Sequence, residues 1–164
     1  MPVTLTPEAK QQALVSIKRF LLEELKPFID RTYRTRPGPA SAAVGGASHG
    51  GLVSLFLVLE HPEVFGQAVV MSPSAMWDDG VMLKRIAALP RRLPVRLWVD
   101  SGALERKVLV DAARDLRQAL LARGWREGVD LAFEEQAGGQ HDELSWASRL
   151  PDALRFLWPA RQSP

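Results

Sequence analysis

The residue with the clearest chemical potential is Ser48, which lies in the stretch "GASHG" at positions 46–50 and fits the pattern G-x-S-x-G. A short apolar run precedes this stretch and an apolar helical run follows it. A strand that turns directly into a helix strains the turn residue and holds its side chain above the sheet. The residues two before and two after must then be small, because strand and helix approach closely. The pattern predicts that Ser48 is a nucleophile and that the backbone N–H of His49 binds a developing oxyanion.

A nucleophilic serine needs a general base, and the base needs an orienting carboxylate. His141 lies in "AGGQHDE", a glycine-rich loop after the last predicted strand, where the chain order Ser, acid, His places the base. The acid is expected after the third predicted strand, where "VDSGALER" offers Asp100 within the strand and Glu105 in the loop. We favour Glu105 because a loop carboxylate can turn toward the imidazole. A charge that complements the dipole of the next helix explains Glu105 nearly as well.

Composition excludes several other kinds of chemistry. The chain has no cysteine, which removes disulfides, thiol catalysis and thiolate metal sites. The net charge is +2 and no basic run carries interleaved aromatics, so no nucleic-acid partner is expected. No apolar run is long enough to cross a bilayer and no signal pattern opens the chain, so we expect a cytoplasmic protein without membrane contact. The glycine-rich turn around Ser48 could in principle bind a dinucleotide, but the strand that follows it, at 67–72, carries no acidic residue to support such binding. Neither a cofactor nor a metal is expected.

The elements that must position these residues alternate along the chain, whose 164 residues suffice for one domain with a core. A helical segment is expected over 1–35, where Pro27 should end or bend the helix. The remainder, 36–164, is expected to run from the serine turn to a C-terminal helix. Strands are predicted over 41–46, 67–72, 94–102 and 129–136, and helices over 49–60, 79–89, 105–124 and after the loop of His141. This alternation predicts an α/β fold with a mostly parallel sheet of about four strands and helices on both faces.

The chain resembles the esterase branch of the α/β-hydrolases that includes enterochelin, esterase D-like and feruloyl esterases. The resemblance rests on "FLLEELKPFIDRTYRTRPGPASAAVGGASHGGLVSLFLVLEHPEVFGQAVVMSPSAMW" and continues through "LWVDSGALE" and "GGQHDELSWASRLPDALRFL". It implies Ser48 as nucleophile, His141 as base and Glu105 as orienting acid of a carboxylic ester hydrolase that forms an acyl-enzyme on a small-molecule ester. It also implies that Ser72, Ser74 and Trp77, within "SPSAMW", lie beside the pocket.

Two features depart from that family. His49 follows the serine where the family usually has Met or Leu. The resemblance also covers only the C-terminal half of the family's fold, so a single truncated α/β-hydrolase-like domain is expected over 1–164. The strand at 41–46 would then be a sheet edge, so a second copy, a partner polypeptide or the N-terminal helix is expected to cover it. The alternative interpretation is a weakly active or inactive half-hydrolase that acts as a binding or assembly module, or is a truncated remnant.

Overall fold

The computed structural model describes residues 6–159. The chain divides into two compact units, Met1–Pro37 and Gly38–Pro164. The first unit is one helical segment made of α1 (Pro7–Arg19), a π-helix (Phe20–Leu25) and α2 (Lys26–Thr32). Of the two effects expected of Pro27, an end of the helix is wrong, because helical structure continues to Thr32. Pro27 lies in the first turn of α2, where a residue without an N–H is tolerated.

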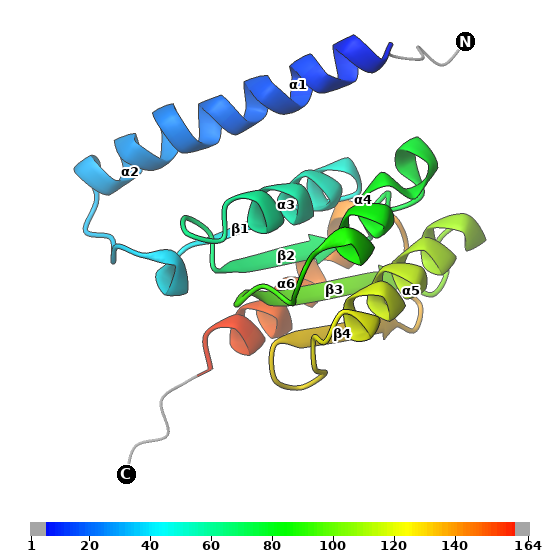
Figure 1. The fold of residues 1–164 in the computed structure, drawn as a ribbon. Coiled ribbons are helices and arrows are strands. Elements are labelled where there is room, and N and C mark those ends of the chain that lie inside the picture. Colours follow the sequence, from blue (N-terminus) through cyan, green and yellow to red (C-terminus); the bar gives the residue numbers. More distant parts are fainter. Residues whose placement is uncertain (1–5, 160–164) are drawn as a thin grey trace. The chain divides into compact units, whose positions relative to one another are not determined.

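The second unit contains a four-stranded sheet in which neighbouring strands are parallel. The strands lie in chain order, as β1 (Ala43–Ala47), β2 (Gln67–Met71), β3 (Arg96–Gly102) and β4 (Leu131–Gln136) (Figure 1). The sequence-predicted α/β class with a parallel sheet of about four strands is confirmed. The strand β1, which ends at the serine turn, is one edge of this sheet.

Helices cover both faces of the sheet, as Figure 1 shows. On one face lie α3 (His49–Glu60), α4 (Trp77–Ala88) and α5 (Lys107–Ala122), and α6 (Glu143–Leu157) lies on the other. The first three connect successive neighbouring strands, so crossovers of one handedness place them on the same side. The helix α3 packs on β1 and β2, whereas α6 packs on β2 and β3. All four helices therefore begin at the carboxyl end of the sheet.

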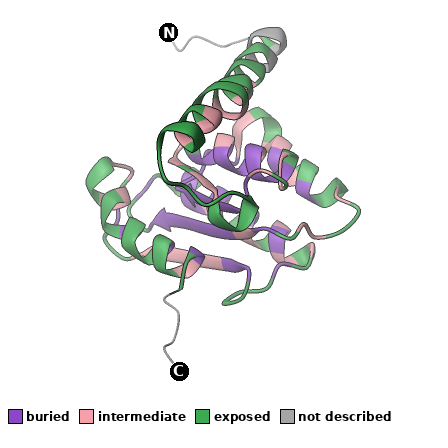
Figure 2. Ribbon diagram, turned by 90° about the vertical axis from the view of Figure 1, so that its left-hand side faces the viewer, coloured by how far each residue is buried: buried purple, intermediate pink, exposed green. Residues whose placement is uncertain are grey.

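The core lies on both sides of the central strands, which Figure 2 shows as buried. Every residue of β2 is buried, as expected for a parallel strand covered on both faces. Val69, Met71 and Trp98 pack against α6, where they meet the fully or nearly fully buried Ala153 and Leu157. Their strand neighbours alternate toward the opposite face and pack under α3, α4 and α5.

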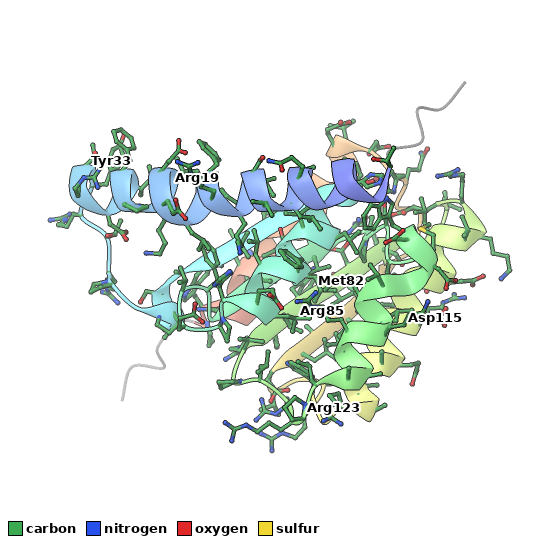
Figure 3. The ribbon with its side chains drawn as sticks, turned by 45° about the horizontal axis from the view of Figure 1, so that its top comes forward. Arg19, Tyr33, Met82, Arg85, Asp115 and Arg123 are labelled. Carbon is green, nitrogen blue, oxygen red and sulfur yellow. The ribbon has the colours of Figure 1, made fainter. Side chains whose placement is uncertain are left out.

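The helices of the opposite face are tied together by surface contacts. Arg85 of α4, labelled in Figure 3, pairs with Glu60 of α3 and lies with its guanidinium 5.2 Å from the ring centroid of Phe56. The helix α5 ends as its sequence predicts, because Gly124 takes a φ of 103° and the next N–H, of Trp125, donates to the Leu120 carbonyl. Within residues 6–159 no helix has the length and apolar character needed to span a membrane.

Candidate functional site

Ser48 stands alone between β1 and α3, in a backbone conformation that side chains other than glycine rarely adopt. Its φ is 57° and its ψ is −120°, which costs on the order of 1–3 kcal/mol and needs support from its surroundings. Its N–H donates to the Met71 carbonyl at 2.9 Å, and its carbonyl accepts from the N–H groups of Leu52 and Ser74 at 3.2 and 3.3 Å. The turn is thus fixed by β2, by α3 and by the loop that follows β2.

The glycines around this turn are not equivalent. A Cβ on Gly46 would lie 2.7 Å from the carbonyl carbon of Gly50, and a Cβ on Gly51 would lie 2.9 Å from the Met71 carbonyl oxygen. A Cβ on Gly50 would meet nothing within 4 Å. The close approach of strand and helix therefore requires Gly46 and Gly51. The expectation that the second glycine of G-x-S-x-G, Gly50, must lack a side chain for this close approach is wrong. The residue that must lack one is the next glycine, Gly51.

His141 and Glu105 are brought together from two loops. His141 follows β4, Glu105 follows β3, and Nδ1 of the imidazole lies 2.8 Å from Oε2 of the carboxylate. The side chain of Glu105 has no solvent exposure, whereas that of His141 is 28% exposed. The loops approach so closely that a Cβ on Gly102 would lie 2.3 Å from the carbonyl oxygen of Gly139. A fully buried carboxylate thus contacts a partly exposed imidazole.

Asp100, the other carboxylate considered from sequence, points elsewhere. Its carboxylate lies 3.0 Å from Nη2 of Arg149 and 2.8 Å from the indole nitrogen of Trp98. Complete burial raises the pKa of Asp100, although hydrogen bonds from Arg149 and Trp98 act in the opposite direction. No hydrogen bond joins Asp100 to His141 in the described chain. Of the two carboxylates left open by the sequence, Glu105 is therefore the one that contacts the imidazole.

Ser48 and His141 follow the two outer strands, β1 and β4, and both lie at the carboxyl end of the sheet. No hydrogen bond joins them in the part of the chain that is described. The hydroxyl of Ser48 lies 3.4 Å from that of Ser74. The loop after β2 also carries Ser72, whose hydroxyl donates to Oε1 of Glu105 at 2.5 Å. This one loop therefore contacts both the serine turn and the buried carboxylate.

The other sequence-predicted residues lie around these three. Ser72 takes a φ of 40° and has no solvent exposure, and its hydroxyl donates to Glu105. Trp77 is half-buried at the start of α4. His49 is exposed and is the first residue of α3, so its N–H belongs to the unpaired group of donors at the N-terminus of that helix.

Sequence reasoning missed Arg149 and Trp146, which both reach this cluster from α6. The indole nitrogen of Trp146 and Nη2 of Arg149 each lie 3.0 Å from the hydroxyl of Ser72. The signal was present in the pattern of α6. Trp146, Arg149, Ala153 and Leu157 recur every three or four residues and form one helix face, so a charged residue stands in an apolar stripe.

A groove of about 630 Å³ lies between α4 and α5, outside this cluster. Its lining includes Met76, Leu83, Val108 and Asp115, the last of which is labelled in Figure 3. Neither Ser48 nor any other residue of the cluster lines it. Among residues 6–159 no group of His, Asp and Glu side chains could hold a metal ion.

Comparison with known proteins places the chain in a family. The family model described as "Putative esterase" matches residues 5–157. The iron(III) enterobactin esterase of Escherichia coli K12 is 31% identical over 145 residues, which cover 84% of this chain and 33% of that protein. The ferri-bacillibactin esterase BesA of Bacillus subtilis is 30% identical over 131 residues, which cover 75% of this chain and 44% of that protein.

A solved structure supports the same fold. The enterobactin esterase FES of Shigella flexneri, crystallised in the presence of 2,3-dihydroxy-N-benzoyl-glycine, aligns with a TM-score of 0.78 at 24% identity. That alignment covers 88% of this chain and 38% of the other. The chain thus spans less than half of each of these three relatives. Because the family model matches nearly the whole chain, the chain belongs to the "Putative esterase" family.

Proposed function

We propose that the chain is a serine hydrolase of carboxylic esters. The observation that carries the proposal is the 2.8 Å contact between Nδ1 of His141 and Oε2 of Glu105, at the carboxyl end of the sheet, where Ser48 also lies. A strained serine, a histidine and a buried carboxylate are the three groups that nucleophilic acyl transfer needs. Each follows a different strand of one parallel sheet, at the end where such sheets place their sites.

In this proposal Glu105 sets the tautomer of the base. A carboxylate oxygen only accepts hydrogen bonds, so Oε2 holds the proton of neutral His141 on Nδ1. The lone pair of the imidazole is then on Nε2, on the side of the ring away from Glu105. That nitrogen can take the hydroxyl proton of Ser48 as the serine attacks the ester carbonyl. The carboxylate then stabilises the imidazolium that forms.

The serine turn supplies the remaining groups. The N–H of His49 is unpaired by the helix and lies at the positive end of its dipole, so it would bind the oxyanion of the tetrahedral intermediate. Collapse of that intermediate returns the proton from His141 to the leaving alcohol and leaves an acyl group on Ser48. Water then attacks the acyl-enzyme with His141 again acting as base. For the first step the hydroxyl of Ser48 must turn from Ser74 to His141.

The relatives suggest the substrate class to examine first. Two of them are esterases named for iron(III) enterobactin and for ferri-bacillibactin, so we propose an ester of a ferric siderophore as the first candidate for this chain. The edge position of β1 supports a second proposal, that a further polypeptide segment pairs with this strand. If ester hydrolysis requires this pairing with β1, the isolated chain would hydrolyse esters only slowly.

Steady-state hydrolysis tests the function. We expect the protein to hydrolyse a ferric catecholate siderophore ester or a short-chain p-nitrophenyl ester, and Ser48→Ala to abolish turnover. Ser41→Ala is the matched control, because Ser41 is an exposed serine in the short 3-10 helix before β1. Turnover that survives in Ser48→Ala would contradict the assignment of the nucleophile. No turnover by the parent protein on either ester class would contradict the esterase proposal for the isolated chain.

A further inference from the structure

The hydroxyl of Ser72 has every hydrogen-bonding position occupied. It has one proton to donate and two lone pairs that can accept. The indole N–H of Trp146 and an N–H of Arg149 donate to it, each at 3.0 Å. An indole N–H and a guanidinium can donate hydrogen bonds but cannot accept them, so these two donors occupy the two lone pairs of the Ser72 hydroxyl. The single proton of Ser72 is left with one acceptor, Oε1 of Glu105 at 2.5 Å.

This arrangement also fixes which oxygen of Glu105 faces the imidazole. Oε1 accepts from Ser72 and from the backbone N–H of Gly102 at 2.7 Å. The other oxygen, Oε2, then has His141 as its partner at 2.8 Å. A carboxylate that rotated about its terminal bond would break both contacts on Oε1. The orientation of Glu105 therefore depends on a hydroxyl whose own orientation depends on α6.

We infer that Arg149 and Trp146 are positioning residues for Glu105, and that they act through the hydroxyl of Ser72. This inference deepens the proposed function and rests on it for its catalytic consequence. Among the described residues no hydrogen bond joins Arg149 or Trp146 to Ser48, so we assign neither a direct role in the chemistry. Their effect would be to keep Oε2 of Glu105 on Nδ1 of His141 while the imidazole gains and loses a proton.

Arg149 is suited to this role because its guanidinium is itself held on several sides. The side chain has no exposure. It donates to the side chains of Gln136 and Ser72, each at 3.0 Å, and pairs with Asp100 at 3.0 Å. It also lies 4.0 Å from Oε1 of Glu105. The planar guanidinium of arginine can donate at once to partners on β3, on β4 and in the loop after β2. The ammonium group of a lysine could not reach these partners with the same geometry.

Trp146 links the same hydroxyl to the base. Its ring packs edge-on against His141, with centroids 5.0 Å apart and an interplanar angle of 83°. Its indole N–H is the second donor to Ser72. One side chain of α6 therefore limits the rotation of the imidazole and of the hydroxyl beneath Glu105. Trp146→Phe would remove the donor and keep most of the ring contact.

Proton NMR tests the inference without any substrate. The Nδ1 proton of His141, assigned by its loss in His141→Gln, is expected far downfield and protected from water exchange in the parent protein. Ser72→Ala, Trp146→Phe and Arg149→Lys should each broaden this resonance and speed its exchange, because Glu105 becomes free to rotate. Ser72→Ala keeps the pair of Arg149 and Asp100, so it tests the inference without exposing a buried charge.

Ser101→Ala is the matched control. Ser101 is also a fully buried serine, and its hydroxyl has no hydrogen-bond partner in the described chain. This variant should leave the resonance unchanged. Trp125→Phe removes another buried indole donor, which bonds the Val95 carbonyl at 3.1 Å, and should also leave the resonance unchanged. An absent resonance in the parent protein would overturn the inference. So would an unchanged exchange rate in folded Ser72→Ala and Trp146→Phe.

Kinetics separates this inference from the proposed function. On an ester that the parent protein hydrolyses, kcat of Ser72→Ala and Trp146→Phe should fall on the order of tenfold to a hundredfold, with KM within about twofold. A role in folding alone would lower the Tm and leave kcat per folded molecule unchanged. If the NMR result is as expected and no variant or parent hydrolyses any ester, the positioning role holds and the esterase proposal fails.

Discussion

Glu105 contacts His141 through one carboxylate oxygen, while its other oxygen is held by a hydroxyl and a backbone N–H. Oε2 lies 2.8 Å from Nδ1 of the imidazole, and Oε1 accepts from Ser72 and Gly102. The two functions of the carboxyl group are thus divided between its oxygens. One oxygen anchors the side chain to the fold and the other is directed at the base.

This division predicts the effect of Glu105→Gln. The amide can place either its oxygen or its NH₂ toward His141, so the tautomer is no longer fixed and the imidazolium loses its counter-charge. We expect kcat to fall on the order of a hundredfold to ten-thousandfold in ester hydrolysis. Glu63→Gln is the control, because it makes the same change in an exposed carboxylate that contacts another imidazole, that of His61, at 3.1 Å. Equal rates for Glu105→Gln and the parent protein would remove Glu105 from the proposed mechanism.

The glycines after Ser48 predict opposite effects on stability. Gly51→Ala places a Cβ 2.9 Å from the Met71 carbonyl oxygen, and we expect it to destabilise the fold by about 1–3 kcal/mol. Gly50→Ala meets no atom within 4 Å and lies in α3, so it should be neutral or stabilise by up to about 1 kcal/mol. Urea denaturation of the two variants measures the difference. A Gly50→Ala variant less stable than Gly51→Ala would contradict the packing described for this turn.

The first turn of α6 predicts a pH dependence of stability. The carboxylate of Asp142 accepts from the N–H of Ser145 at 2.8 Å, and this bond holds the pKa of Asp142 below its ordinary value of 3.8. A lowered pKa means that the folded state favours the ionised form. The stabilisation is therefore present above pH 3.8 and is lost as pH falls through the lower folded value.

Asp142→Asn keeps an oxygen acceptor that does not titrate. The Tm of the parent protein should exceed that of Asp142→Asn by a few degrees near neutral pH, and the difference should shrink as the pH falls below the ordinary value. Asp115→Asn removes an exposed carboxylate within α5 and controls for the change in net charge. A difference in Tm that grows on acidification would contradict this account of Asp142.

The edge strand predicts the behaviour of the protein in solution. One side of β1 has no paired strand in the described chain, and its residues are small and apolar. We expect this edge to be covered, with amide protons of Ala43–Ala47 protected from hydrogen exchange and a mass above the 18.2 kDa of one chain. Light scattering after gel filtration measures the mass. A single 18.2 kDa species with freely exchanging β1 amides would show that the edge needs no cover.

Most of the fold could be predicted because its signals are local. The helix over 49–60 and the end of α5 just before Gly124 follow from apolar runs and one glycine. Pro27 was misread because its effect depends on its place within the helix. Gly50 and Gly51 could not be told apart, since their difference arises from the position of β2, which is far away in the chain.

The candidate site was predictable in its residue types and less so in its supports. Spacing along the chain indicated Ser48 and His141, and it left Asp100 and Glu105 as alternatives. Asp100 and Glu105 differ in the direction in which their side chains point. The direction of Asp100 depends on its ion pair with Arg149, in a helix about fifty residues further along the chain. No local pattern encodes that contact. The charged residue in the apolar stripe of α6 was the available signal.

The most direct test of the account is intact-mass analysis after incubation with a fluorophosphonate, which reacts with an activated serine. We expect one adduct on the parent protein, none on Ser48→Ala, and an unchanged adduct on Ser41→Ala. This result would establish that the turn after β1 and the pair of His141 and Glu105 activate one serine in the isolated chain. A folded parent protein that forms no adduct, or a Ser48→Ala variant that still forms one, would contradict the central claim.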